Sequence, residues 1–366
     1  MMRIAVLRAL HLGDLLLLIP ALRALRAAFP HARIDFIGLP WAREFLARFG
    51  YTDDFLEFPG WPGIPEVPVE ADRLAAFLVR VRQRRYDLAL QFHGNGAVSN
   101  GFLAALGARL TVGYYPADGH GLRPDLGQPY PEDLPEVLRC LNLLTLLGVR
   151  PRGAALEFPL HPADRAEAAA RLGPADQPGR PLVVLHPGAR PPARRWPAER
   201  FAALARRLRA DGLTVVVVGG PSDRETLAAV RAHLDPAVPV IADLSLGGLA
   251  ALLARATLFI GNDSGPAHLA VAVDTPSLRL FGPADPRRWA PLDQTRHRLL
   301  HRPVACSPCQ HWTCPLDHRC LRQWTVPVVH QAARDLLAAT ASPVARQPGL
   351  GAARRSPATT PQSGAA

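Results

Sequence analysis

Lysine is absent from this chain of 366 residues, so that each of its 42 basic side chains is an arginine. Against 31 acidic residues this leaves a formal net charge of +11 at neutral pH. Such an excess favours an anionic partner, which can be a nucleic acid, a membrane surface or a phosphorylated ligand. The arginines are dispersed and form no basic motif interleaved with aromatic residues. We therefore expect no nucleic acid, and a phosphorylated ligand or an anionic lipid surface instead.

Long hydrophobic runs are also missing. The longest run near the N-terminus, at 15–22, is far short of the roughly 20 apolar residues that cross a bilayer. Arg3 and Arg8 precede this run, as basic residues do in a secretion signal, but Gly13 and Asp14 interrupt the place where the apolar stretch should begin. We expect a cytoplasmic protein whose contact with a membrane, at the inner face of the inner membrane, is peripheral and depends on arginine side chains.

Two nucleotide-binding signatures are absent as well, because the chain contains neither the glycine-rich dinucleotide fingerprint nor a P-loop. Hydride transfer and nucleoside triphosphate hydrolysis thereby lose their main support from the sequence. The chain instead alternates short apolar runs with amphipathic stretches, which is typical of an α/β protein with parallel sheets covered by helices. Strands are expected at residues 3–7, 34–37, 88–91, 182–185, 214–218 and 258–260.

The expected strands fall into two sets, which predicts two Rossmann-like domains facing each other across a cleft. A polar helix at 163–172 and a loop at 173–180 separate the two sets and mark the domain junction. We divide the chain into a first domain at 1–170, a second domain at 171–325, a C-terminal helix at 326–340 and a tail at 341–366. The tail consists mostly of small residues, proline and arginine, and it is expected to be disordered because it cannot bury enough surface to offset its ordering entropy.

The most informative segment is 259–270, where an apolar strand runs into Asp263 and Ser264. Either side chain can cap a helix, and the backbone N–H groups from Gly265 onward form an anion site at the helix start. His268 follows one helical turn later and adds a side-chain donor. A helix dipole and an imidazole together suit a diphosphate. The expected ligand is a nucleotide or a nucleotide-sugar.

Two further segments carry candidate site residues. Asp14 comes after the first strand, and a carboxylate beyond the carboxyl end of such a strand points into the crevice where open α/β sheets bind ligands. It is the candidate general base, with helix capping as the alternative. In the second half a strand leads to Gly188 and Ala189, and Arg194 follows before a helix that starts near Pro197. This is a second anion-receiving surface, unless its arginines form only a solvated face.

Together these segments resemble the ADP-heptose:lipopolysaccharide heptosyltransferases, which are glycosyltransferase family 9, over roughly residues 2–335. The resemblance implies a GT-B fold with an N-terminal acceptor domain, a C-terminal nucleotide-sugar domain, and a C-terminal helix that returns to the first domain. The blocks that carry it are Leu12-Gly13-Asp14, Arg194-Arg195-Trp196-Pro197, the run from Asn262 to His268, and Phe281-Gly282-Pro283.

The resemblance also implies roles for these residues, with Asp14 as the catalytic base. The implied reaction moves a heptose from ADP-heptose to a lipopolysaccharide-core or other lipid-linked acceptor in a single inverting displacement, in which Asp14 takes the proton of the acceptor hydroxyl. Arg194 and His268 would stabilise the departing diphosphate without a metal or another cofactor. A UDP-sugar donor and an inactive nucleotide-sugar-binding protein are the alternatives. The implied donor contacts are Gly188, Ala189, Arg194, Asp263, Ser264, Gly265 and His268.

Two departures from the family pattern concern specificity. Arg194 stands where the family usually has lysine, which keeps the charge but changes the phosphate geometry. Pro135-Glu136-Val137 stands where members often show His-Glu-Val in the acceptor domain, so that the acceptor is expected to differ. The candidate acceptor contacts are Gly13, His93 and Asn95, and a hydrogen-bonded structural role is the alternative for His93.

Four of the five cysteines, Cys306, Cys309, Cys314 and Cys320, lie within 15 residues of one another. A C-x-x-C pair followed by two more thiols matches the ligands of a structural zinc, and His311 or His318 could replace one thiol. The pattern leaves three alternatives open, which are a structural metal, a disulfide in an oxidising compartment, and free thiols packed in the domain. None of them implies a catalytic metal.

Overall fold

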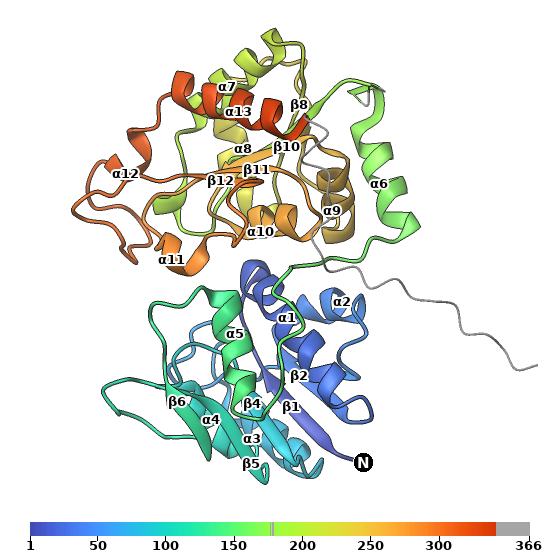
Figure 1. Cartoon of the computed structure of the whole chain (residues 1–366), viewed down its shortest axis with the longest axis vertical. Coiled ribbons are helices and arrows are strands. Elements are labelled where there is room, and N and C mark those ends of the chain that lie inside the picture. Colours follow the sequence, from blue (N-terminus) through green and yellow to red (C-terminus); the bar gives the residue numbers. More distant parts are fainter. Residues whose placement is uncertain (176, 178, 342–366) are drawn as a thin grey trace, which may run out of the picture.

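The computed structural model describes residues 1–175, 177 and 179–341, and Figure 1 shows them as two α/β domains, one above the other. All but the first residue of the predicted tail at 341–366 lies outside the described residues. In the described part of the chain, no helix combines the length and the apolar character needed to cross a membrane.

The first domain is built on a parallel six-stranded sheet in the order β3-β2-β1-β4-β5-β6. Its central strands are almost entirely buried, as expected for a parallel sheet covered by helices. The strands are β1 (Arg3–Leu7), β2 (Arg33–Gly38), β3 (Asp54–Glu57), β4 (Leu88–Gln91), β5 (Leu110–Tyr115) and β6 (Leu126–Pro129). The helices are α1 (Leu12–Ala28), α2 (Ala42–Ala47), α3 (Ala71–Arg82), α4 (Ser99–Ala105) and α5 (Glu136–Thr145).

The second domain repeats this plan with a parallel six-stranded sheet in the order β12-β11-β10-β7-β8-β9. The strands are β7 (Leu182–His186), β8 (Thr214–Val218), β9 (Val240–Ile241), β10 (Leu258–Asn262), β11 (Ser277–Leu280) and β12 (His297–Leu300). The helices are α6 (Pro162–Leu172), α7 (Ala198–Ala210), α8 (Arg224–Arg231), α9 (Leu246–Arg255), α10 (Gly265–Ala272), α11 (Pro286–Trp289), α12 (Arg319–Arg322) and α13 (Val326–Ala341).

In both sheets the strand order reverses next to the first strand, between β1 and β4 and between β7 and β10. Doubly wound sheets bind ligands in the crevice outside the carboxyl ends of the strands at this point. The segments that follow β1, β7 and β10 hold Asp14, Gly188 and Asp263. The topology therefore places Asp14 at the ligand-binding edge of the first sheet, and Gly188 and Asp263 at that of the second.

The six strands expected from the sequence are all present, each within two residues of its predicted bounds, and they form β1, β2, β4, β7, β8 and β10. The predicted polar helix at 163–172 is α6. The α/β fold class is confirmed. The predicted domain boundary after residue 170 falls inside α6, which packs against α9 of the second domain (Figure 1).

The expectation that the C-terminal helix returns to the first domain is wrong. α13 packs against α7, and Figure 1 places it on the side of the second domain remote from the first. Its buried side chains Val329, Ala333 and Leu336 belong to the hydrophobic core of the second domain. Their spacing of four and three residues puts them on one face of the helix, and this core buries that face.

The two domains touch where the start of α1 meets α10. A Cβ atom at Gly13 would lie 2.9 Å from Cδ2 of His268, closer than such atoms approach in proteins. Glycine at this position therefore lets the backbone of the first domain come directly against the helix that begins at the predicted anion site.

Candidate active site

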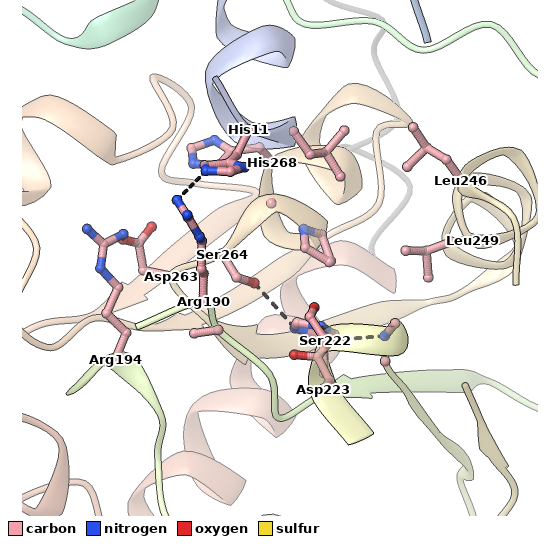
Figure 2. Close-up of a pocket in the computed structure, with 18 of the residues that line it drawn as sticks. His11, Arg190, Arg194, Ser222, Asp223, Leu246, Leu249, Asp263, Ser264 and His268 are labelled. Atoms are coloured by element: carbon pink, nitrogen blue, oxygen red, sulfur yellow. Dashed lines mark hydrogen bonds and ion pairs between the residues drawn. The ribbon is translucent and has the colours of Figure 1, made fainter. Parts of the chain in front are cut away.

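A cleft of about 740 Å³ lies between the two domains, and residues from both of them line it (Figure 2). The predicted catalytic residues and most of the predicted donor residues therefore share one surface. The predicted site residues that line the cleft are Gly13 and Asp14 from the first domain, and Ala189, Arg194, Asp263, Ser264, Gly265 and His268 from the second.

Asp263 and Ser264 lead from β10 into α10, but their side chains have other partners than the helix cap that we expected. Ser264 is the N-cap residue by position, and its hydroxyl oxygen lies 3.3 Å from Nδ1 of His186. The Asp263 carboxylate accepts a hydrogen bond from Arg194 at 3.1 Å. Burial raises the pKa of Asp263, and Arg194 opposes that rise. Arg194 is thereby held beside the helix start, where an anion would bind.

A histidine–aspartate pair supports this helix start, and we did not identify it from the sequence. His186 is buried at the end of β7, and its Nε2 lies 3.3 Å from Oδ2 of Asp223. With the proton on Nε2, the ring donates to Asp223 and accepts from Ser264. Asp223 also accepts from the Gly220 backbone N–H at 2.9 Å. No local pattern reveals this pair, because 37 positions separate its members.

Gly188 lies just behind the residues that line the cleft. A Cβ atom at this position would lie 2.1 Å from Oδ1 of Asp223, so that any side chain would displace the carboxylate. The buried Asn262 fixes the same loop, since its Nδ2 donates to the Pro187 carbonyl at 2.8 Å and its Oδ1 accepts from the Trp196 backbone N–H at 3.0 Å. The loop after β7 is therefore held from two sides.

His268 is buried in α10, next to Gly13 of the other domain. Burial, together with the cations Arg279 and Arg194, holds the pKa of its imidazole well below the ordinary value. The ring is therefore neutral near pH 7 and offers one N–H donor rather than a positive charge. The positive charge at this end of the cleft comes from Arg190 and Arg194.

Asp14 is the third residue of α1, and His11 occupies the N-cap position. Its Oδ1 lies 3.4 Å from Nη2 of Arg8, and 20% of its side chain is exposed. Asp14 lines the cleft, and the predicted donor residues that share the cleft belong to the other domain. A carboxylate that is open to the cleft and held by one buried arginine is suited to accept a proton from a bound hydroxyl group.

A family model for glycosyltransferase family 9 (heptosyltransferase) matches residues 74–319, well over half of the chain. The chain belongs to glycosyltransferase family 9. It is 30% identical to lipopolysaccharide heptosyltransferase 3 of Escherichia coli over 76% of this chain and 83% of that protein. It is also 28% identical to lipopolysaccharide heptosyltransferase 2 of Escherichia coli strain K12 over 80% of this chain and 86% of that protein.

Among solved structures, that of the E. coli ADP-heptose lipopolysaccharide heptosyltransferase II matches with a TM-score of 0.73. The two sequences are 22% identical, and the match covers 93% of this chain and 100% of the other. The likeness shows a common fold and confirms the GT-B architecture of this family 9 enzyme. The protein is a glycosyltransferase, as the sequence predicts.

In this family 9 glycosyltransferase, the described residues that line the cleft include the predicted acceptor residue Gly13 but neither His93 nor Asn95. Nδ1 of His93 accepts from the Ala9 backbone N–H at 3.3 Å, and burial together with Arg8 lowers the pKa of the ring to about 4. Oδ1 of Asn95 accepts from the backbone N–H two positions further on, at 3.1 Å. An acceptor role for these two residues stays a prediction.

Several further cleft residues of this glycosyltransferase were not singled out from the sequence, and three of them, His11, Arg190 and Trp312, are linked by contacts. His11 of the first domain hydrogen-bonds across the cleft to Arg190 of the second (Figure 2). Burial and the charge of Arg190 lower the pKa of His11, so that this ring too is neutral near pH 7. The Arg190 guanidinium lies 5.5 Å from the ring centre of Trp312, which also lines the cleft. Both contacts join residues that are far apart in the sequence, so that no local motif predicts them.

All five cysteines lie in the described part of the chain, and each is a free thiol. Four of them, Cys306, Cys309, Cys314 and Cys320, line one small cavity. Among the described residues, no group of three His, Cys, Asp or Glu side chains is arranged to hold a metal ion. Trp312 belongs to this segment, and its carbonyl accepts from the Ala193 backbone N–H at 3.1 Å, which joins the segment to the loop after β7.

We expect three thiols to react quickly with a disulfide reagent in the folded enzyme and two only after unfolding. Cys306 is exposed, and Cys309 and Cys314 are half-buried. Cys140 and Cys320 are buried, and burial raises the pKa of their thiols to about 12 and about 11, which leaves little reactive thiolate. Absorbance titration before and after denaturation measures both classes. Fewer than three fast thiols, together with zinc released on denaturation, would instead mean that the cluster binds a metal.

Proposed function

We propose that the enzyme transfers a heptose from ADP-heptose to a lipopolysaccharide core or another lipid-linked acceptor, with inversion and with Asp14 as the general base. The observation that carries the proposal is the single cleft that Asp14 of the first domain shares with Arg194 and the start of α10 in the second. Relatives named lipopolysaccharide heptosyltransferases support the choice of sugar and acceptor.

The chemistry of the cleft supports a nucleoside diphosphate donor. Arg190 and Arg194 lie toward one end of the cleft, and Leu246 and Leu249 lie toward the other (Figure 2). A diphosphate takes charge-assisted hydrogen bonds from guanidinium groups, and a nucleobase prefers an apolar surface. We therefore assign the diphosphate to the arginines and the base to the leucines.

In the proposed reaction, Asp14 accepts the proton of an acceptor hydroxyl, and the hydroxyl oxygen attacks the anomeric carbon on the face opposite the diphosphate. The new carbon–oxygen bond forms as the bond to the diphosphate breaks, which inverts the configuration. The departing nucleoside diphosphate keeps the electron pair of the broken bond. Arg194 and the N–H group of His268 stabilise the charge that develops on it.

On the acceptor side we propose contacts from Gly13, His93 and Asn95. We also place the enzyme at the cytoplasmic face of the inner membrane, where anionic headgroups would attract it peripherally. Exposed arginines on and after α3, namely Arg80, Arg82 and Arg85, support this location. Such a contact would weaken as the salt concentration rises.

The test is an assay of nucleotide release by the purified enzyme with ADP-heptose and with several UDP-sugars, each with and without a truncated lipopolysaccharide acceptor. Release from ADP-heptose that requires the acceptor supports the proposal, and mass spectrometry of the acceptor then identifies the added sugar. Release from a UDP-sugar alone would change the donor. Tight nucleotide binding without turnover of any donor would instead favour a binding protein.

A further inference from the structure

Three arginines surround the buried carboxylate of Glu136, the first residue of α5. Its Oε1 accepts from Arg8 at 2.9 Å, and its Oε2 accepts from Arg139 at 2.5 Å and from Arg288 at 3.0 Å. Only 6% of the Glu136 side chain is exposed. Burial alone would raise the pKa of Glu136, but the three arginines outweigh burial and bring it to about 2. Glu136 is therefore ionised wherever the enzyme can be assayed.

Arg8 links Glu136 to the proposed base. One atom of Arg8, Nη2, lies 2.9 Å from the Glu136 carboxylate and 3.4 Å from that of Asp14. Arg8 is buried, and its Nη1 donates to the Phe92 carbonyl at 2.7 Å, which fixes the guanidinium in place. Asp14 and Glu136 therefore share one donor. A change in the charge around Glu136 alters how strongly Arg8 acts on Asp14.

Arg288 reaches Glu136 from the other domain. It belongs to α11, and 152 positions separate it from its partner. Its guanidinium lies 4.5 Å from the ring centre of Trp289, which lines the cleft, and 5.8 Å from that of Tyr130 in the first domain. The ion pair between Arg288 and Glu136 exists only while α11 lies against the first domain. The pair is therefore present only when the cleft is closed at α11.

We propose that Glu136 is a positioning residue that couples closure of the two domains to the base Asp14 through Arg8. This rests on the proposed role of Asp14. When the cleft is closed, Arg288 takes up part of the Glu136 charge, and Arg8 holds the Asp14 carboxylate in place. When the domains separate, Glu136 keeps only its two arginines from the first domain and draws Arg8 more strongly. The Asp14 carboxylate is then held in position only while the cleft encloses the substrates.

The test is a double-mutant cycle of Arg288→Gln and Glu136→Gln, with Arg287→Gln as the matched control. Arg287 also belongs to α11, and it makes an exposed ion pair with Asp133 of the first domain at 3.1 Å. Its loss removes the same charge from the same interface but leaves Glu136 untouched. For each variant, kcat and KM are measured by acceptor-dependent nucleotide release across the acidic and neutral pH range, with the donor that the enzyme turns over.

We expect Arg288→Gln to lower kcat about tenfold and to leave the donor KM within about twofold, because Arg288 acts on the position of Asp14 and not on donor binding. Glu136→Gln should also lower kcat with little change in the donor KM, and Arg287→Gln should stay within about twofold of the unmodified enzyme. In the double variant the effect of Arg288→Gln should disappear, because its partner is gone.

Equal losses for Arg288→Gln and Arg287→Gln would overturn the proposal, and so would a loss in Arg288→Gln that falls on the donor KM and leaves kcat unchanged. Arg288 is 30% exposed, so that its replacement should leave the fold intact. The comparison of Arg288→Gln with Arg287→Gln therefore tests the coupling even if Glu136→Gln does not fold. Asp14→Asn is assayed alongside. Full activity of that variant contradicts the proposed base itself, whereas an inactive Asp14→Asn with a normal Arg288→Gln contradicts only the coupling.

Discussion

Asparagine in place of Asp14 is expected to lower kcat by about 10²-fold to 10⁴-fold, with the affinity for ADP changed less than about threefold. The amide keeps the size of the carboxylate but cannot take a proton from the acceptor hydroxyl. The donor-side residues, from Ala189 to His268, belong to the other domain. The loss should therefore fall on the chemical step and leave donor binding in place.

Initial rates of acceptor-dependent nucleotide release measure this kcat, and calorimetric titration with ADP measures the affinity. Asp118→Asn is the control, because Asp118 is exposed in the loop between β5 and β6 and its replacement leaves the cleft intact. This variant should match the unmodified enzyme. An Asp14→Asn enzyme that kept more than about a tenth of the kcat would show that another group takes the proton.

Alanine in place of Arg194 is expected to lower kcat/KM by about 10²-fold to 10³-fold. Arg194 brings positive charge to the start of α10 and holds the buried Asp263 carboxylate at 3.1 Å. Burial raises the pKa of Asp263, and without Arg194 one of the two arginines that lower it is lost. Any negative charge that remains on this carboxylate then repels the donor diphosphate. The donor KM should therefore rise, and kcat should fall because the leaving diphosphate loses its cation.

Arg194→Lys is the matched control for this prediction, since lysine keeps the charge and loses the planar fork of the guanidinium. We expect it to recover most of kcat and to retain a donor KM several-fold above that of the unmodified enzyme. Thermal unfolding of both variants separates an effect on the site from a loss of the fold. A donor KM that is unchanged in Arg194→Ala would place the diphosphate elsewhere in the cleft.

The central strands could be predicted because each is a short continuous apolar run. β7 and β8 each contain four consecutive apolar residues that are buried, which is the signature of a parallel sheet covered by helices. The four edge strands were not predicted, and neither were β5 and β11, which lie next to edge strands. β6 is partly exposed and includes Pro129, and β9 has only two residues. Such strands form because a neighbouring strand pairs with them, and their own periodicity says little.

Local motifs also predicted several of the residues that line the cleft. Asp14 and the segment from Asp263 to His268 were found because they follow apolar strands and begin helices. Their partners were not found in the same way. The capping roles expected at the start of α10 were replaced by contacts of Ser264 with His186 and of Asp263 with Arg194. These contacts join segments that are remote in the sequence, so that no spacing rule reveals them.

By itself, the sequence determined the α/β class, the central strands, the family resemblance and the residues at the strand ends that line the cleft. All of these depend on local periodicity or on short motifs that can be read along the chain. The tertiary structure alone decided that α13 packs on the second domain, that His268 is neutral, and that Glu136 joins Arg8 to Arg288. Burial and charge pairing depend on groups that folding brings together from distant parts of the chain.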